Sequence, residues 1–437
     1  MDEGKAAGPL AGLRVIEMEG LGPCPLAGQF LADLGAEVTL IVRKAGPADP
    51  TDIVNRGKRS AALDLKSERG LEAAKRLIAR ADVVIEGFRP GVMERLGLGP
   101  EPMLAANPGL VFGRMTGWGQ DGPLSPTAGH DINYLGITGV LNAIGRRGET
   151  PPPPLNIGAD YAGGTMFLLL GVLSALYERG RSGRGQVVDA AMIDGATALM
   201  SLFHSFLARG WWRNEREANL LDGGAPFYRT YRCRDGKFLS VGALEPQFHA
   251  ALLRIAGLPA AHGETQEERA EWPARHALYE EVFATRTRDE WAAAFAGSDA
   301  CVAPVMDWEE APAHPQMAAR GVLAPVGGVM QAAPAPRFAR TPARPARPPS
   351  AAGGAIRMRC CGRWGWRERT AVRTPRPLSM PIPASKRISP GERCRGRRPE
   401  AQAAVRGAPS SPGRRRSGRA RRGGRGDAPA GGAAGAG

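Results

Sequence analysis

The chain has 437 residues, 43% of them hydrophobic and 23% charged, which suffices for two ordinary domains or one large one. Its net charge is +15, from 58 Lys and Arg against 43 Asp and Glu. Residues 341–437 hold 23 of the basic and 4 of the acidic residues. Residues 1–340 therefore contain 35 basic and 39 acidic residues and are almost neutral. The basic charge is therefore a property of the tail and does not indicate a nucleic-acid-binding body.

The first half of the chain alternates strand and helix patterns. A strand is predicted over Leu13–Met18, a helix from residue 25 to Gly35, and a strand over Glu37–Arg43. A helix over residues 70–81 precedes two more strands, within 82–88 and 109–119, the last running into a Gly-rich turn. This order predicts a large, doubly wound, Rossmann-like α/β domain with parallel strands. No G-x-G-x-x-G follows the first strand, so a dinucleotide site is not expected.

The second half predicts a smaller α+β domain. The apolar run Met166–Tyr177 is too short to span a bilayer and indicates a buried helix. Residues 201–215 read as a helical connector, and residues 225–244 as a β-hairpin around Asp235-Gly236. Further elements follow in 246–258, 277–296 and 299–311. The predicted divisions are a large domain over 10–200, a linker over 201–221, a small domain over 222–320, a return segment over 321–348 and a tail over 349–437.

The tail is rich in Arg, Pro, Gly and Ala without apolar periodicity. Such a segment cannot bury enough surface to fold, so we expect it to be disordered or an out-of-frame product of a GC-rich gene. A basic arm that binds nucleic acid is the alternative, although it contains a single short RRGGRG run.

The cysteines of the body are Cys24, Cys233 and Cys301, and none stands in a C-x-x-C or metal spacing. This argues against a disulfide framework or structural zinc and favours a reducing compartment, with the cytoplasm as the default. The N-terminal residues lack the apolar core of a secretory signal.

Two segments carry groups suited to proton transfer. "GHDINYLGITG" places His130, and "PLNIGADYAGG" places Asp160 about thirty residues later, each at the apparent start of a helix. An imidazole and a carboxyl group at positively polarised helix ends can move a proton across a carbon and stabilise the anion between them. The alternative is that Asp131 and Asp160 are N-caps and His130 is a satisfied neighbour.

A set of strings in one order resembles the α-methylacyl-CoA racemase branch of the class III CoA-transferase (CaiB/BaiF) family. The resemblance covers roughly residues 10 to 345 and rests on "NRGKRSAALDLK", "FRPGVMERLGLGP", "MTGWGQDGPL", "AGHDINYL", "GRGQVVDAAMIDG", "LDGGAPFYRTY" and "VGALEPQF". It implies an interlocked homodimer whose active site lies at the junction of a large and a small domain.

The resemblance also implies a reaction, the interconversion of (R)- and (S)-2-methylacyl-CoA thioesters by 1,1-proton transfer through an enolate. His130 and Asp160 are then the two bases on opposite faces of the α-carbon. The Asp131 N–H is the oxyanion donor, and Glu245 orients the imidazole. A surface role for Glu245 is the alternative.

CoA binding follows from the same resemblance, and CoA is part of the substrate, with no further cofactor or metal. Fork-shaped or point cations and free backbone donors suit its phosphates. The implied residues are Arg43, Ala62, Leu63, Asp64, Leu65, Lys66, Arg89, Gly129, Ile132, Asn133 and Tyr134. Lys58, Arg59 and Lys66 form a candidate basic patch, with a solvated surface stretch as the alternative for Lys58 and Arg59.

Three other functions stay open. In a CoA-transferase of the same superfamily, Asp160 would be a nucleophile that forms an anhydride and then a thioester. A nucleic-acid-associated protein would act through its basic tail. A pseudoenzyme would bind CoA alone. No pattern of residues in the sequence indicates which acyl chain is preferred. In a eukaryote, the resemblance implies a peroxisomal or mitochondrial protein.

Overall fold

A computed structural model of the chain describes residues 8–343 and 347–351, all within one compact unit. The disordered or out-of-frame tail predicted for 349–437 falls, from residue 352 onward, outside the described residues.

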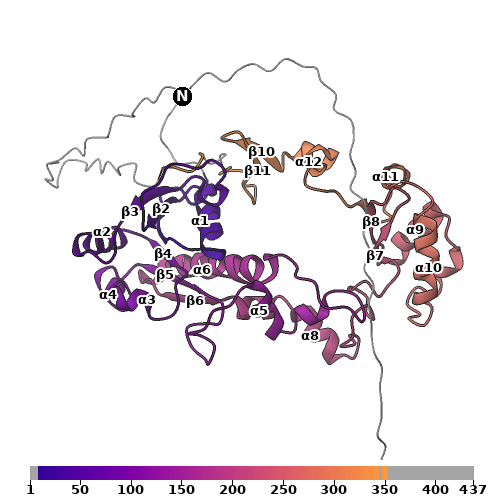
Figure 1. The fold of residues 1–437 in the computed structure, drawn as a ribbon, viewed down its shortest axis with the longest axis horizontal. Coiled ribbons are helices and arrows are strands. Elements are labelled where there is room, and N and C mark those ends of the chain that lie inside the picture. Colours follow the sequence, from indigo (N-terminus) through magenta and orange to yellow (C-terminus); the bar gives the residue numbers. More distant parts are fainter. Residues whose placement is uncertain (1–7, 344–346, 352–437) are drawn as a thin grey trace, which may run out of the picture. The chain divides into compact units, whose positions relative to one another are not determined.

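A parallel six-stranded sheet forms the centre of the α/β part of this unit, called the large domain below, with strand order β3-β2-β1-β4-β5-β6 (Figure 1). The strands are β1 (Arg14–Met18), β2 (Glu37–Val42), β3 (Arg59–Ala62), β4 (Val83–Glu86), β5 (Val111–Thr116) and β6 (Val187–Ala191). This is the order typical of Rossmann folds, and it places the topological switch point between β1 and β4. The predicted α/β class, its parallel strands and the first strands of the sheet are confirmed.

Helices cover both faces of the sheet because each strand buries side chains on both sides. Val15, Val83 and Val111 pack with α1 (Pro23–Asp33) and α6 (Met166–Ser182). The residues that follow, such as Ile16, Val84 and Phe112, pack on the opposite face with helices that include α2 (Glu68–Ile78). The other elements of this domain are η1 (Ile53–Asn55), α3 (Val92–Arg95), α4 (Pro100–Ala106), α5 (Asp131–Ile137), η2 (Leu141–Ala143), η3 (Ile157–Thr165), α7 (Met192–Ala198) and α8 (Ser201–Ala208). The domain is therefore doubly wound.

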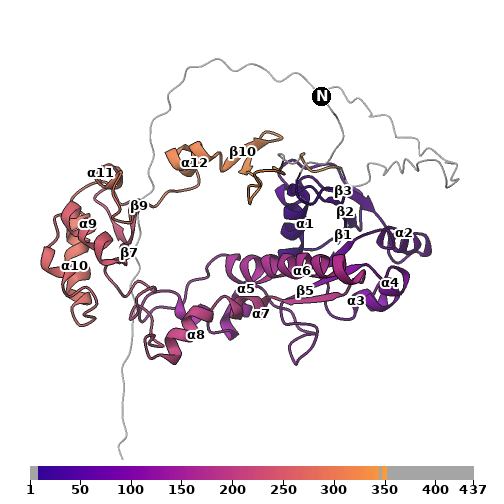
Figure 2. The ribbon, with the colours of Figure 1, turned by 180° about the vertical axis from the view of Figure 1, so that it is seen from behind.

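The apolar helix α6 is longer and less buried than its sequence indicated. It continues from the π-helical segment η3, and the joint stretch Ile157–Ser182 is long and apolar enough to cross a membrane by length and composition, with 44% of its apolar window buried. Its inner side packs on β5 and β6 through Leu168 and Val172 (Figure 2). A partly buried core helix passes the same test, so the stretch is weak evidence for a membrane span.

A smaller α+β region follows α8. The predicted hairpin is confirmed: β7 (Tyr228–Arg232) and β8 (Phe238–Gly242) are antiparallel, and Gly236 in their turn has a φ of 80°. A second core gathers aromatic side chains such as Phe227, Tyr231 and Trp291. The remaining elements are α9 (Pro246–Ala256), η4 (Ala260–Gly263), α10 (Trp272–Phe283), α11 (Arg288–Phe295), β9 (Val302–Pro304), η5 (Ala311–Ala313) and α12 (Pro315–Arg320). The stretch 277–296 divides into two helices because Thr287 caps α11 with Glu290.

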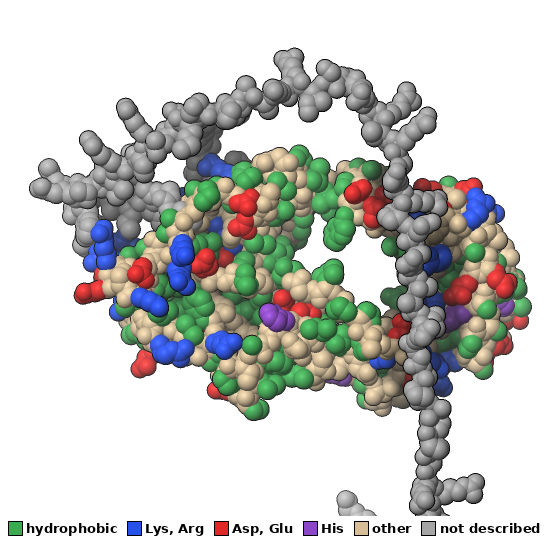
Figure 3. Space-filling model, viewed as in Figure 1, with side chains coloured by type: hydrophobic (Ala, Val, Ile, Leu, Met, Phe, Trp, Pro, Cys, Tyr) green, Lys and Arg blue, Asp and Glu red, His purple; other side chains and the backbone are tan. Residues whose placement is uncertain are grey.

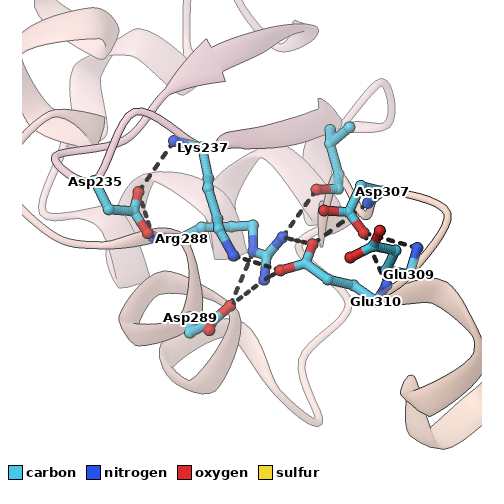
Figure 4. Close-up of polar contacts among 8 residues, drawn as sticks. Asp235, Lys237, Arg288, Asp289, Asp307, Glu309 and Glu310 are labelled. Carbon is cyan, nitrogen blue, oxygen red and sulfur yellow. Dashed lines mark hydrogen bonds and ion pairs between the residues drawn. The ribbon is translucent and has the colours of Figure 1, made fainter. Parts of the chain in front are cut away.

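An ion-pair network fixes the end of this region (Figure 4). The Arg288 guanidinium donates to both carboxylate oxygens of Glu310, at 2.5 and 3.0 Å, and Lys237 pairs with the same carboxylate. These hydrogen bonds, first from Arg288 and then from Lys237, lower the pKa of Glu310 to about 2. Glu310 therefore stays ionised throughout the ordinary pH range and ties the segment after β9 to α11.

The chain then returns to the large domain through a second hairpin, β10 (Leu323–Val326) and β11 (Val329–Ala332). The buried Arg56 guanidinium forms two bonds to Asp33 on α1, at 2.6 and 3.0 Å. The same group donates to Gln331 Oε1 and to the Ala332 carbonyl, both at 2.7 Å. One side chain thus fastens the returning chain to the large domain.

Candidate active site

The carboxyl ends of neighbouring parallel strands bring the candidate residues to one edge of the sheet. Ala62 ends β3 and residues 63–66 follow it, Arg43 follows β2, and Arg89 follows β4. The turn after β5 contains Trp118, which packs edge-on against Tyr134 of α5, with 4.7 Å between ring centroids. Ligands of open parallel sheets bind at this edge, next to the switch point.

His130 is the N-cap of α5, with an extended backbone and an exposed side chain. Asn133 Oδ1 accepts its backbone N–H at 3.1 Å. The N–H of Asp131 follows in the first turn, where amides have no acceptor within their own helix. The N-caps are therefore His130 for α5 and Asn156 for η3, and the alternative that assigned this role to Asp131 and Asp160 is wrong.

Asp160 lies half-buried in the first turn of η3, beside the loop after β1. A Cβ placed on Gly22 would lie 3.4 Å from Asp160 Oδ2, and the φ of 71° at Gly22 also favours glycine there. Burial raises the pKa of Asp160, the Asn156 amide at 3.4 Å lowers it, the Asp131 charge raises it, and His130 lowers it.

Asp131 joins the two helix starts. Its Oδ2 accepts the backbone N–H of Ala159 at 2.6 Å and that of Asp160 at 2.8 Å. Because Asp131 follows His130 directly, this carboxylate links the backbone of both candidate bases. The structure therefore brings together His130, Asp131 and Asp160.

Tyr134 forms the wall behind this group. It is buried, and its hydroxyl donates to the Gly129 carbonyl at 2.5 Å. A Cβ on Gly129 would lie 2.6 Å from the Tyr134 ring, so only glycine fits at this contact. On the exposed side of the same helix, Ile132 and Asn133 face solvent.

The residues predicted to bind CoA lie at the ends of three strands and at the start of α5, where Gly129, Ile132, Asn133 and Tyr134 stand. The side chains of Arg43, Lys66 and Arg89 are exposed. The Arg43 N–H donates to Glu19 at 2.8 Å, which fixes the backbone after β2. Ala62 is the last residue of β3, and the turn after it runs through Leu63, Asp64, Leu65 and Lys66. In this turn the Lys66 N–H donates to Asp64 at 3.0 Å.

Lys58 does not belong to a basic patch, and that prediction was wrong. Its ammonium is buried and bonds Glu17 at 2.8 Å, the Pro25 carbonyl at 2.9 Å and Asn55 at 3.1 Å. Arg59 stays exposed, with a long ion pair of 3.8 Å to Glu37. The pattern of charges in sequence could not distinguish these two neighbours, since they point to opposite sides of β3.

Glu245 lies apart from the group around His130 in the described chain. It is the exposed N-cap of α9 in the smaller region. Burial raises the pKa of Cys301, and the charge of Glu245 raises it further. Within residues 8–343 and 347–351, no hydrogen bond or ion pair joins Glu245 to His130.

A cavity of about 400 Å³ opens along the carboxyl ends of β1 and β2. Its walls include the loop residues Leu21 and Gly22 and, from η3, Tyr161, the neighbour of Asp160. Lys44 and Ser60 also line it, although sequence reasoning selected Arg43 and Ala62 beside them. Ser60 and Tyr161 lie within the quoted strings NRGKRSAALDLK and PLNIGADYAGG, but their residue types did not mark them as cavity-lining. Lys44 lies outside these strings, and its place just after the end of β2 was the available signal.

The fold and this site define an α/β protein with a Rossmann-like parallel sheet and with a histidine and an aspartate on neighbouring helix starts at the sheet's carboxyl edge. The chain belongs to CoA-transferase family III, whose model matches residues 10–354. It is 48% identical to the alpha-methylacyl-CoA racemase of Mus musculus over 337 residues, which are 77% of this chain and 88% of that protein. The human alpha-methylacyl-CoA racemase is 44% identical over the same lengths.

Solved structures show the same architecture. The crystal structure of Rv3272 from M. tuberculosis matches with a TM-score of 0.66 and 28% identity, covering 80% of this chain and 98% of that one. The family resemblance read from the sequence is therefore confirmed, as is the homology to alpha-methylacyl-CoA racemases.

Proposed function

We propose that this chain is a 2-methylacyl-CoA racemase that moves the α-proton of the thioester between His130 and Asp160. The observation that carries the proposal is the Asp131 carboxylate, which links the backbone of the segment bearing Asp160 to the helix start bearing His130. The homology to alpha-methylacyl-CoA racemases over 77% of the chain supports the substrate class.

The chemistry needs one base on each face of the α-carbon. His130 removes the α-proton from one epimer, which leaves a planar enolate, and the protonated Asp160 returns a proton to the opposite face. In the reverse direction the carboxylate of Asp160 removes the proton and the imidazolium donates. Burial raises the pKa of Asp160, so this acid carries a proton to donate more often than an exposed acid would.

The enolate oxygen needs a donor that is already in place. The Asp131 N–H in the first turn of α5 is such a donor, and the positive end of the helix favours the developing charge. Glycine at 129 and the buried ring of Tyr134 keep the backbone beside it in one conformation.

The phosphates of CoA would meet the exposed cations at the carboxyl edge. Replacing Arg43 or Arg89 with Ala should raise the KM for the CoA ester about 10-fold each, with little change in kcat, because a charge-assisted hydrogen bond to phosphate is lost equally from substrate and transition state. Steady-state kinetics measure both constants. Arg59→Ala is the matched control, since Arg59 is also exposed but lies at the start of β3, at the opposite edge of the sheet. A fall in kcat alone would contradict the assignment.

An interlocked homodimer is the second part of the proposal. Met166, Leu170, Leu173 and Tyr177 follow one exposed side of α6, and each is between 38% and 74% exposed. Figure 3 shows further hydrophobic side chains on the surface of one face of the molecule. A continuous apolar stripe of this kind is typical of a protein interface. In this dimer, Glu245 of a second copy would meet His130, since no hydrogen bond or ion pair joins the two within the described residues of one chain.

Leu170→Asp should shift the protein from dimer to monomer, because it places a charge in the centre of the apolar stripe. Sedimentation equilibrium measures the mass. Trp308→Asp, at a residue that is 90% exposed on the smaller region, should leave the mass unchanged. A wild-type chain of monomeric mass would overturn this part.

The test of the function is α-proton exchange in heavy water with (S)-2-methylacyl-CoA. A racemase incorporates one α-deuterium and produces both epimers. A CoA-transferase that uses Asp160 as nucleophile would instead move CoA to an added carboxylic acid without α-deuterium. A folded protein that binds the ester and does neither would be a pseudoenzyme.

The cysteines of the described residues bear on the cellular compartment. Cys24, Cys233 and Cys301 are free thiols. Free thiols favour a reducing compartment, and we infer the cytoplasm, or a peroxisome or mitochondrion in a eukaryote. Fractionation of the source cells tests this.

A further inference from the structure

The side chain of Asp131 is a buried carboxylate within the candidate site. The residue is 5% exposed. One oxygen, Oδ2, accepts two successive backbone N–H groups, those of Ala159 and Asp160, while Oδ1 has no hydrogen-bond partner among the described residues. A buried charge is costly unless such bonds stabilise it, so its place calls for a role.

We propose that Asp131 is a positioning residue, whose carboxylate fixes the backbone of Asp160 so that this base faces the same α-carbon as His130. The inference rests on the proposed racemase function and assigns to the side chain a role separate from that of its N–H group. Two short bonds from one oxygen leave little freedom to the peptide groups on either side of Ala159. The direction of the Asp160 side chain then follows from its fixed backbone.

The position of these hydrogen bonds at the start of η3 explains why a carboxylate suits residue 131. Ala159 and Asp160 stand in the first turn of η3, whose N–H groups have no acceptor within the helix. A carboxylate satisfies two of them and is favoured by the positive end of the helix. The same residue presents its own N–H in the first turn of α5. Asp131 therefore carries the oxyanion donor on its own N–H, while its side chain fixes the backbone of Asp160.

The charges around Asp160 determine the expected pH dependence. From α5, it faces His130, Asp131 and the Tyr134 hydroxyl; from its own segment, it faces the Asn156 amide. The α1 side presents the uncharged Gly22. The negative charge of Asp131 adds to burial in raising the pKa of Asp160. Removing that charge should lower the pKa of Asp160 and keep it ionised to lower pH.

The experiment follows α-deuterium uptake from each epimer separately, as a function of pH, in Asp131→Asn and Asp131→Ala. In Asp131→Asn the amide oxygen still accepts the two N–H bonds, so exchange persists and its acidic limb moves to lower pH for the epimer that Asp160 deprotonates. In Asp131→Ala the backbone is released, and exchange from that epimer falls about 100-fold, the cost of a misplaced reacting group. Exchange from the other epimer changes much less.

Asp82→Asn is the matched control, because Asp82 also accepts a backbone N–H, that of Arg14 at 2.9 Å, at the opposite edge of the sheet. Thermal melting verifies that each variant is folded, and Asp131→Asn carries the test if Asp131→Ala is not. Equal losses at both epimers, or unchanged pH profiles, would overturn the inference. Absence of exchange in the wild type would instead overturn the proposed function itself.

Discussion

Replacing His130 with Ala should lower α-proton exchange from one epimer of a 2-methylacyl-CoA by about 10²–10⁴-fold, the usual contribution of a general base. Asp160→Ala should do the same for the other epimer. Each variant keeps the base that serves the opposite face, so exchange there continues without inversion. Racemisation fails in both variants, since it requires a proton on each side.

Proton NMR in heavy water measures this loss of the α-proton from each pure epimer. His204→Ala is the control for the imidazole, because His204 is exposed on α8 and bonds no residue of the candidate site. If a single variant abolished exchange from both epimers while the protein stayed folded, the two-base scheme would be wrong. Activity as a transferase in His130→Ala but not in Asp160→Ala would favour the nucleophilic alternative.

Lys58→Met should destabilise the fold by about 3–5 kcal/mol, the cost of leaving one charge of a buried pair alone. Lys58 and Glu17 are both fully buried at their side chains and lie 2.8 Å apart. Glycine at position 28 leaves the space for this pair, since a Cβ there would lie 1.7 Å from Glu17 Oε2. Chemical denaturation at pH 7 measures the free energy of unfolding.

The loss should depend on pH through Glu17. Burial raises its pKa from 4.5 to about 7, against the lowering effect of Lys58. A group with a raised pKa in the folded state contributes its stability below the unfolded value and loses it as the pH rises through the folded value. Without Lys58 the pKa of Glu17 rises further, so the deficit of Lys58→Met should be smallest near pH 4.5 and grow above pH 7. Adding Glu17→Gln to Lys58→Met should recover most of the lost free energy of unfolding. A loss of stability in Lys58→Met that does not depend on pH would contradict this account.

The sequence allowed a good prediction of the central strands and of the order of elements. β1, β2 and β4 are nearly continuous apolar runs because both faces of the sheet are covered. The edge strands β3 and β6 were missed as strands. β3 has the residues Arg-Ser-Ala-Ala and shows no apolar run, and in β6 Asp189 interrupts the short sequence Val-Val-Asp-Ala-Ala. Their positions depend on pairing with β2 and β5, which local sequence does not encode.

The candidate site could be predicted in part for similar reasons. His130 and Asp160 stand in helix-start patterns that can be recognised locally, and the structure brings them together. The bridging role of the Asp131 side chain depends on a contact between residues 28 and 29 positions apart. The burial of Lys58 depends on Glu17, 41 residues away. Such contacts arise from the fold, and residue types alone do not reveal them.

The single guanidinium of Arg56 has a consequence for the order in which the chain acquires its structure. The last strand of the large sheet ends at Ala191, so all six strands can pair once that residue has left the ribosome. Two of the acceptors of Arg56, Gln331 and the Ala332 carbonyl, lie about 140 residues further along. Until these two residues emerge, the N–H groups of Arg56 that will bond to them can donate only to water, although this guanidinium is buried in the finished fold. We therefore expect hydrogen exchange on nascent chains to show protected β1, β4 and β5 well before α1 and η1 become protected.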